Sequence, residues 1–326
     1  ILLMTKLTII GAGRWGKNHI RTAHEMGVLG GVIDANPESL AKVQELYPDV
    51  PVFESLDMPG ALDNQAYTVA VPAEHHYPVA KTLLEKNKHV LVEKPITLNA
   101  TDAEALTQIA KDNQCVLMTG HLLLFHPAIL KIKDYIDRGQ LGKLQYMYSN
   151  RLNLGTVRTE ENSLWSFAPH DLSIFQFLTQ RYPETVSATG GAFLQPHIHD
   201  TTLTTLKYPQ NVSGHIFVSW LHPFKEHRFV VVGSKGMLTF EDSSPNKELL
   251  FYEKGIDFVN GEPIKREGAT QTLAYDHAQP LQAELQHFLD CIAGKDQNNK
   301  ISGQHGLDVL KLLERAQHAL DGVPVS

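Results

Sequence analysis

The segment Gly11-Ala12-Gly13-Arg14-Trp15-Gly16 lies between a short apolar run, residues 7–10, and a stretch with the apolar spacing of a helix. Glycines at its first, third and sixth places allow a tight turn, a close approach of a pyrophosphate, and close packing of helix on strand. The helix start adds unpaired N–H groups and the positive end of a dipole. Because three glycines in six residues also occur in ordinary loops, the surrounding elements decide the interpretation.

A second apolar run, residues 31–33, ends at Asp34. An acid about 20 residues beyond such glycines accepts hydrogen bonds from the adenosine ribose hydroxyls. Its charge also repels a 2′-phosphate, and no Lys or Arg follows before Lys42. Turn, strand and acid together predict NAD binding, with NAD preferred over NADP. The alternative is a solvated Asp that opens an ordinary turn.

Short apolar runs alternate with helical patterns up to about residue 120, which is typical of a parallel, doubly wound α/β sheet of the Rossmann type. Thr101 and Glu104 have the spacing of a capping box before a helix over 102–112. Ligands bind at the carboxyl ends of such strands. We therefore expect the residues that follow two of the strands to face the cofactor. The predicted strands are 7–10, 31–33, 50–53, 67–71, 89–92 and 116–118, and the residues that follow two of them include Val71, Pro72, His76, Glu93 and Lys94.

The pattern changes after residue 121 to long β runs in succession, which predicts an α+β domain with a large, mostly antiparallel sheet. We place the domains at 1–121 and 122–326. Residues 242–272 are the least patterned and predict loops and short edge strands. The expected strands are 144–153, 186–193, 201–208, 212–220, 228–232 and 237–240, and the expected helices are 127–137, 163–178, 281–292 and 304–320.

Length, net charge, apolar stretches and cysteine spacing limit the classes of protein to which the chain could belong. A chain of 326 residues exceeds one usual core, and a net charge of −7 argues against a nucleic-acid partner. No stretch approaches the ~20 apolar residues of a membrane span, and Ile1-Leu2-Leu3 lacks the basic leader of a signal peptide, so Met4 could be the natural start. Cys115 and Cys291 show no CxxC spacing. These features predict a cytoplasmic protein with reduced thiols and no membrane partner.

Two side chains could handle protons. Lys94 stands between Glu93 and Pro95 just past a buried strand, where partial desolvation favours acid–base chemistry. His170 follows Pro169 at an expected helix start, where the dipole favours a neutral, proton-accepting imidazole. The alternatives are a solvated lysine beside Glu93 and a histidine that only bonds locally, with Asp171 complementing the helix.

The combination of motifs resembles the Gfo/Idh/MocA family of NAD(P)-dependent sugar and polyol oxidoreductases, over essentially the whole chain. The order and spacing of the motifs carry the resemblance. They are Gly11–Gly16, Glu93-Lys94-Pro95, Gly120-His121, Phe125-His126-Pro127, Ser219-Trp220, Val232-Gly233-Ser234, His287-Phe288-Leu289 and Gly306-Leu307.

The resemblance implies a Rossmann domain followed by a sheet domain whose outer face makes homodimers or homotetramers. It also implies that Lys94 lies near nicotinamide and substrate and that His170 is the catalytic histidine. His76 matches a family histidine near the cofactor, and the alternative is a role only at the start of a helix. An aspartate common in the family four residues before the catalytic histidine is Ser166 here. The acid–base work is therefore expected from Lys94 and His170, with support from Asp171 or His121.

Within the family, residues 151–165 look most like the branch that oxidises the 3-hydroxyl of UDP-N-acetylglucosamine or its uronic acid, ahead of an aminotransferase in cell-surface polysaccharide or lipid A synthesis. Arg151 or Arg158 could pair with a pyrophosphate or carboxylate, or be exposed charges. The rivals are a dehydrogenase of a free sugar, inositol or other polyol, and an NAD-binding regulatory sensor. Expected substrate-binding residues are His121, Arg151, Arg158, Asn162, Trp165 and Asp171.

His197-Ile198-His199-Asp200 has two imidazoles at a spacing seen in some metal sites, but no third ligand is near in the sequence. We therefore expect no metal. Trp15 either shields the cofactor or packs between domains.

Overall fold

The computed structural model describes residues 5–276 and 278–322 and divides the chain into two compact units. One unit holds residues up to Phe125 together with Gln279–Leu310, and the other holds His126–Ala278 with the residues from Lys311 on. The predicted single boundary after residue 121 is therefore corrected. The chain returns to the first unit near its end, and a return of this kind leaves no signal at the first boundary.

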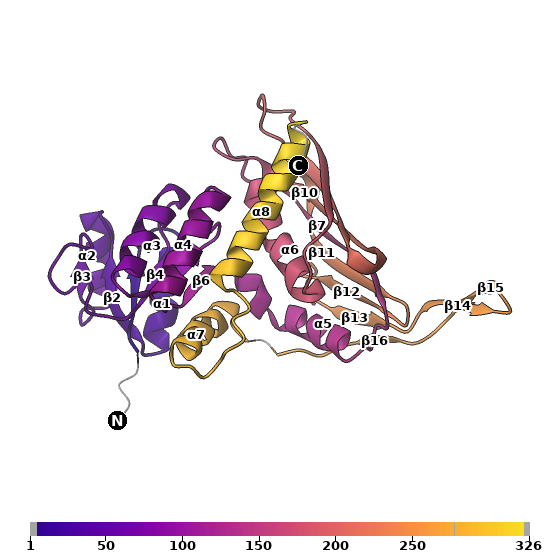
Figure 1. Ribbon diagram of the computed structural model, residues 1–326, viewed down its shortest axis with the longest axis horizontal. Coiled ribbons are helices and arrows are strands. Elements are labelled where there is room, and N and C mark those ends of the chain that lie inside the picture. Colours follow the sequence, from indigo (N-terminus) through magenta and orange to yellow (C-terminus); the bar gives the residue numbers. More distant parts are fainter. Residues whose placement is uncertain (1–4, 277, 323–326) are drawn as a thin grey trace. The chain divides into compact units, whose positions relative to one another are not determined.

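The first unit is built on a six-stranded parallel sheet in the order β3-β2-β1-β4-β5-β6 (Figure 1). Strands buried on both faces read as continuous apolar runs, which is why the sequence pattern located them. The order reverses beside β1, and this reversal marks the ligand crevice of a doubly wound sheet. The strands are β1 (Leu7–Ile10), β2 (Leu29–Ile33), β3 (Val52–Phe53), β4 (Ala66–Val69), β5 (His89–Glu93) and β6 (Leu117–Gly120).

In the first unit, α4 and α7 follow the expected helices 102–112 and 281–292 within two residues. The cap of α4 differs from the expectation, because Asn99 and not Thr101 accepts the hydrogen bond of the Asp102 N–H. An Asn side chain is as good a cap as Thr, and it lies where the chain leaves the preceding loop. The helical elements are α1 (Gly16–Glu25), α2 (Pro37–Leu46), η1 (Ala73–His75), α3 (His76–Glu85), α4 (Ala100–Asp112), η2 (Leu122–Phe125), α7 (Pro280–Ile292) and the start of α8 (Gly303–Leu320).

The edge strand β6 is covered by the returning chain. The N–H of Thr119 donates to the carbonyl of Ile301 at 2.9 Å, and Met118 forms an isolated antiparallel bridge with Ser302. A Cβ on Gly306 would lie 2.0 Å from Thr119 Oγ1, so only glycine allows this approach. The last segment therefore seals an edge that would otherwise be open to another strand.

The second unit contains an eight-stranded sheet in the order β16-β13-β12-β11-β7-β10-β9-β8 and a separate ribbon, β14 with β15 (Figure 1). All neighbours in the large sheet pair antiparallel except β7 and β10. The expected fold class is confirmed, and so are short strands within 242–272. The strands are β7 (Leu144–Leu154), β8 (Thr185–Gly191), β9 (Thr201–Tyr208), β10 (Val212–Ser219), β11 (Leu221–Gly233), β12 (Met237–Glu241), β13 (Leu249–Tyr252), β14 (Gly255–Val259), β15 (Glu262–Arg266) and β16 (Thr270–Thr272).

Helix α6 (Ser163–Thr179) packs on the middle of this sheet, against β7, β9 and β10, and α5 (Pro127–Asp137) packs beside it. The ring of Phe175 meets Phe229 edge to face at 5.6 Å, and Gly214 leaves the space that Phe175 fills. This packing holds α6, which carries His170, in a fixed place on the sheet. In the described part of the chain no helix is long and apolar enough to cross a membrane.

Candidate active site

The three glycines of the first turn have three different surroundings. Gly11 has a φ of 99°, and a Cβ there would lie 2.5 Å from the Ala70 carbonyl oxygen. A Cβ on Gly16 would lie 1.9 Å from the Gly11 carbonyl oxygen, whereas a Cβ on Gly13 would meet nothing within 4 Å. The outer glycines are thus required by the fold, and Gly13 and Arg14 are exposed. The open space at Gly13 fits the close approach of a pyrophosphate to the backbone.

Asp34 lies directly after β2 and is tied to the glycine turn. Its Oδ2 accepts the N–H of Ala12 at 2.6 Å, and its Oδ1 accepts the N–H of Asn36 at 2.8 Å. A carboxylate oxygen has further acceptor capacity, so ribose hydroxyls could still bind there. The same contacts fix the position of the carboxylate relative to Gly13.

Glu93, the last residue of β5, joins three parts of the first unit. Its Oε1 accepts hydrogen bonds of 2.6 Å from Trp15 Nε1 and from His19 Nε2, and its Oε2 accepts the N–H of Lys94 at 3.2 Å. Burial raises the pKa of Glu93, but the hydrogen bond from His19, the His19 charge and the other donors outweigh burial and lower it. Glu93 is therefore an ionised side chain that links the glycine turn to Lys94.

The Lys94–Pro95 peptide bond is cis, and Lys94 is half-buried. His121, directly after β6, is 3 % exposed, and its ring meets that of His305 edge to face at 5.3 Å. Burial, then His305, then the charge of Lys94 lower the pKa of His121 well below its usual value. His121 is thus a neutral imidazole next to Lys94. Neither of its ring nitrogens has a partner among the described residues.

His76 contacts the segments that follow β4 and β5. Its ring is 1 % exposed, with Nδ1 at 2.7 Å from the Pro95 carbonyl and Nε2 at 2.9 Å from the Val71 carbonyl. Both polar atoms are used by main-chain oxygens, so any effect of His76 on a cofactor passes through Val71 and Pro95. The neighbouring Val71 is half-buried and Pro72 is exposed.

Glu284 was not predicted from the sequence. It lies on α7, is fully buried, and neither carboxylate oxygen has a partner within residues 5–276 and 278–322. The available signal is its place on the apolar face of α7, one turn from Leu281 and from Phe288.

His170 lies well inside α6 rather than at its start, since the helix begins at Ser163 and includes Pro169. The helix dipole acts mainly within the first turn. The expectation that the dipole favours a neutral His170 is therefore wrong, because His170 lies beyond that turn. The next residue, Asp171, is fully buried. Arg151 on β7 donates to it from Nε at 3.0 Å and from Nη2 at 2.9 Å, and Ser149 donates at 2.7 Å. Asp171 thus anchors α6 to β7 next to His170.

The other residues expected to bind substrate have different surroundings. Asn162 caps α6 by accepting the N–H of Trp165 at 3.1 Å. Gln317 on α8 accepts from both, at 2.8 Å from Asn162 Nδ2 and 3.1 Å from Trp165 Nε1. Arg158 is exposed in the segment between β7 and α6. The cap and Gln317 fix the start of the helix, and Arg158 keeps an exposed guanidinium.

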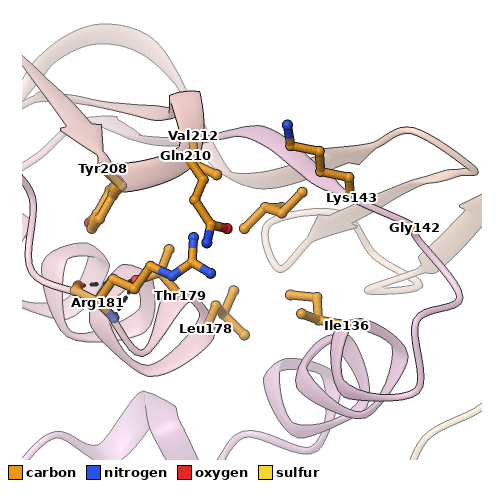
Figure 2. Close-up of a pocket in the computed structure, with 10 residues that line it drawn as sticks. Ile136, Gly142, Lys143, Leu178, Thr179, Arg181, Tyr208, Gln210 and Val212 are labelled. Atoms are coloured by element: carbon orange, nitrogen blue, oxygen red, sulfur yellow. Dashed lines mark hydrogen bonds between the residues drawn. The ribbon is translucent and has the colours of Figure 1, made fainter.

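A pocket of about 240 Å³ in the second unit is lined by none of the residues predicted to bind substrate. Figure 2 shows the guanidinium of Arg181 and the side chain of Gln210 turned toward one another in it. The lining consists of Ile136, Gly142, Lys143, Leu144, Leu178, Thr179, Arg181, Tyr208, Gln210 and Val212.

The segment with His197 and His199 is organised by Asp200, which is fully buried. Asp200 accepts the N–H groups of Phe193 and Leu194, at 2.6 and 2.9 Å, and the indole N–H of Trp220 at 2.6 Å. Within the described ranges no group of three His, Cys, Asp or Glu side chains could hold a metal ion.

The strand order, the glycine turn and Asp34 define a dinucleotide-binding protein of the Rossmann class. Residues 5–121 match the oxidoreductase family with an NAD-binding Rossmann fold, and residues 129–239 match the GFO/IDH/MocA C-terminal domain. The chain belongs to the GFO/IDH/MocA family of oxidoreductases, and it is an NAD-binding enzyme related to dehydrogenases that act on CH–OH groups.

Two characterised relatives span almost the whole chain. The UDP-N-acetylglucosamine 3-dehydrogenase of Acidithiobacillus ferrooxidans is 28 % identical over 87 % of this chain and 88 % of its own length. The inositol 2-dehydrogenase of Rhizobium meliloti is 22 % identical, with 96 % of both chains covered.

Solved structures agree with the fold. The structure of the Acidithiobacillus ferrooxidans enzyme superposes with a TM-score of 0.85 at 25 % identity, covering 97 % of both chains. The WlbA dehydrogenase of Bordetella pertussis, solved in complex with NADH and UDP-GlcNAcA, superposes with a TM-score of 0.79 at 20 % identity over 99 % of both chains.

Proposed function

We propose that the protein oxidises a hydroxyl of a nucleotide sugar with NAD, at C3 of UDP-N-acetylglucosamine or a related UDP-sugar. The observation that carries the proposal is the likeness to the UDP-N-acetylglucosamine 3-dehydrogenase, in sequence over 87 % of this chain and in fold with a TM-score of 0.85. The exposed Arg158 supports a phosphate-bearing substrate, because a guanidinium matches a pyrophosphate with two hydrogen bonds.

In the proposed reaction the hydroxyl loses its proton to the protein while its carbon loses a hydride. NAD, when bound, supplies the hydride acceptor. Lys94 and His170 are the proposed proton acceptors, with Glu93 and the Asp171–Arg151 pair as the groups that hold each of them in place. Proton transfer to a positioned side chain contributes roughly 10² to 10⁴ in rate.

Cofactor binding is assigned in the proposal to the glycine turn and to the residues that follow the strands. Gly13 and Arg14 would contact the pyrophosphate, and Asp34 would contact the adenosine ribose. The proposed set is Gly11, Gly13, Arg14, Trp15, Gly16, Asp34, Val71, Pro72, His76, Glu93 and Lys94 for the cofactor, and His121, Arg151, Arg158, Asn162, Trp165 and Asp171 for binding or supporting the binding of the substrate.

A second candidate is a polyol dehydrogenase, favoured by the inositol 2-dehydrogenase that matches 96 % of the chain. In either case the protein would work in the cytoplasm as a homodimer or homotetramer. A 3-keto sugar would pass to an aminotransferase in cell-surface polysaccharide or lipid A synthesis, because a ketone accepts an amino group.

The test is formation of NADH, followed by its near-ultraviolet absorbance, with UDP-N-acetylglucosamine, its uronic acid, UDP-glucose and free inositol. An aminotransferase is added to remove unstable ketone. We expect turnover with a UDP-N-acetyl sugar and competitive inhibition by UDP. Turnover with inositol and no inhibition by UDP would replace the proposal with the second candidate.

A further inference from the structure

The pocket of about 240 Å³ in the second unit has no part in the proposed reaction. Its walls come from the last turn of α5, the segment that enters β7, the last turn of α6 and the connection between β9 and β10. None of the lining residues that the structure describes belongs to the proposed cofactor or substrate set. The volume is just below the roughly 300–1,000 Å³ of drug-sized ligand sites, so the pocket has room for a small organic molecule.

Much of the wall of this pocket is apolar. The ring of Tyr208 and four aliphatic side chains line it, which are Ile136, Leu144, Leu178 and Val212. Tyr208, Leu178 and Val212 are buried, so this part of the wall belongs to the packed interior of the unit. Apolar walls of this kind favour the apolar part of a ligand, because its burial removes hydrocarbon from water.

The guanidinium of Arg181 is a half-buried positive charge in this pocket. Its Nη1 donates to the Pro209 carbonyl at 3.4 Å, which is long for such a bond. Within residues 5–276 and 278–322 no carboxylate forms an ion pair with it. A guanidinium has five N–H donors in a planar fork, which matches an anion with two parallel hydrogen bonds.

The other charges around the pocket also favour an anion. Lys143 adds an exposed ammonium group to the lining, and none of the described lining residues is acidic. On the last turn of α5, Asp134 already pairs with Arg138 at 2.7 Å. Asp137 pairs with Lys133. The C-terminal ends of α5 and α6 contribute about −0.5 charge each, which is less than the two full positive charges.

Gln210 places an amide beside this guanidinium. It lies in the three-residue connection between β9 and β10 and has a φ of 64°, a conformation that is uncommon for residues other than glycine. Figure 2 shows its side chain turned toward the guanidinium of Arg181. An amide NH₂ group donates two hydrogen bonds, so Gln210 and Arg181 together offer donors to one anion.

We propose that this pocket binds a small carboxylate with an apolar body, at a site separate from the residues of the proposed reaction. Arg181 would hold the carboxylate with two parallel hydrogen bonds, Gln210 would donate to one of its oxygens, and the aliphatic walls would surround the body. One fork between apolar walls fits a carboxylate better than a phosphate, which has three acceptor oxygens and a larger charge. The inference depends neither on NAD binding nor on the identity of the sugar.

The experiment is a saturation-transfer NMR titration of the full-length protein with isocaproate, in the presence of NADH and UDP. The uncharged control is isocaproamide, and inorganic phosphate is the anion without an apolar body. We expect saturable binding of isocaproate that weakens with added salt, and roughly ten- to a hundredfold weaker binding of the amide. Isocaproate that does not bind saturably, or binds no better than its amide or than phosphate, overturns the inference and leaves the proposed function intact.

Two variants locate the binding of isocaproate. Arg181→Met removes the charge and keeps an aliphatic stem, so the affinity should fall roughly ten- to a hundredfold. Arg228→Met, which removes an exposed arginine paired with Glu241 in the same unit, is the matched control and should bind as the wild type does.

Leu144→Trp fills the pocket without a change of charge and should abolish binding. Wild-type affinity in Arg181→Met, or binding that persists in Leu144→Trp, overturns the assignment of the site. If one of these variants does not fold, the other variant decides together with the wild-type comparison of isocaproate and its amide.

Discussion

The indole Nε1 of Trp15 donates a 2.6 Å hydrogen bond to Oε1 of Glu93, so the glycine turn and the strand end that carries Lys94 are directly joined. Trp15 is 41 % exposed, yet its one polar atom is used inside the unit. A phenylalanine in its place would leave the half-buried carboxylate of Glu93 with one donor fewer. This contact leads to the first prediction.

Trp15→Phe should lower the free energy of unfolding by about 1–3 kcal/mol, since it removes a bond to a half-buried charged acceptor, and it should weaken NAD binding because the glycine turn is no longer tied to the end of β5. Binding is measured by titration of the purified protein. Trp165→Phe is the matched control, because it removes an indole bond to Gln317 in the other unit. Equal losses of NAD affinity in both variants would contradict the assigned role of Trp15.

Substitutions at two glycines of the turn should have different effects, one on the stability of the fold and the other on NAD binding. Gly16→Ala forces a Cβ to within 1.9 Å of a carbonyl oxygen and should lower the free energy of unfolding by about 1–3 kcal/mol or more. Gly13→Ala meets no atom within 4 Å, so it should melt like the wild type and yet lose NAD affinity. Melting curves and cofactor titrations of the two variants provide the check, and an unstable Gly13→Ala would refute this division of roles.

Lys94→Ala should retain NAD binding within severalfold while kcat falls by roughly 10² to 10⁴. Lys94→Arg keeps the positive charge but removes a group that readily gives up a proton, so it should not restore kcat. The measurement is steady-state turnover with the UDP-sugar beside a direct NAD titration. Wild-type turnover in Lys94→Ala would remove this lysine from the mechanism.

Asp171→Ala should lower the free energy of unfolding of its unit by about 3–5 kcal/mol, because it leaves Arg151 half-buried without a counter-charge. Asp134→Ala breaks an exposed pair with Arg138 in the same unit and should cost less than about 1 kcal/mol. Denaturant titrations compare the two. Similar small effects in both variants would show that the Asp171 pair does not anchor α6.

Asp200 predicts a dependence of stability on acid pH. Burial raises the pKa of Asp200, but the N–H groups of Leu194 and Phe193 and the indole of Trp220 outweigh burial and lower it. A lowered folded-state pKa contributes stability that is present above the ordinary range of Asp, about pH 4, and is lost as pH falls through the folded value.

Asp200→Asn should therefore be less stable at neutral pH by about 1–3 kcal/mol, and its unfolding free energy should fall less steeply on acidification than that of the wild type. Thermal or denaturant unfolding between neutral pH and pH about 3 measures both slopes. If the unfolding free energies of the variant and the wild type fall equally steeply on acidification, the acid sensitivity comes from other carboxyl groups.

Much of the first unit could be predicted because its strands are buried on both faces. Residues 7–10 were expected as a strand and form β1 with the same bounds. The strand over 228–232 was expected to be short, yet β11 runs from Leu221 to Gly233. Its first half is mostly exposed and polar, so it lacks the alternation that reveals a half-buried strand.

Only part of the candidate site could be predicted from the sequence. Asp34 could be located because its distance from the glycines is fixed by one helix, α1, and one strand, β2. The bond between Asp171 and Arg151 and the bonds of Gln317 join residues far apart in the sequence. Tertiary packing brings these residues together, and no local spacing records it.

The return of the chain to its first unit has a consequence for how the protein is made. On the ribosome, β6 emerges long before Ile301 and Ser302, the residues that close its edge. The edge of this sheet therefore stays open until Ile301 and Ser302 have been synthesised, although domains usually fold in order as they emerge. A nascent chain halted before residue 279 would expose that edge and would be a client for chaperones, and a gene fragment ending at residue 121 would encode an incomplete domain.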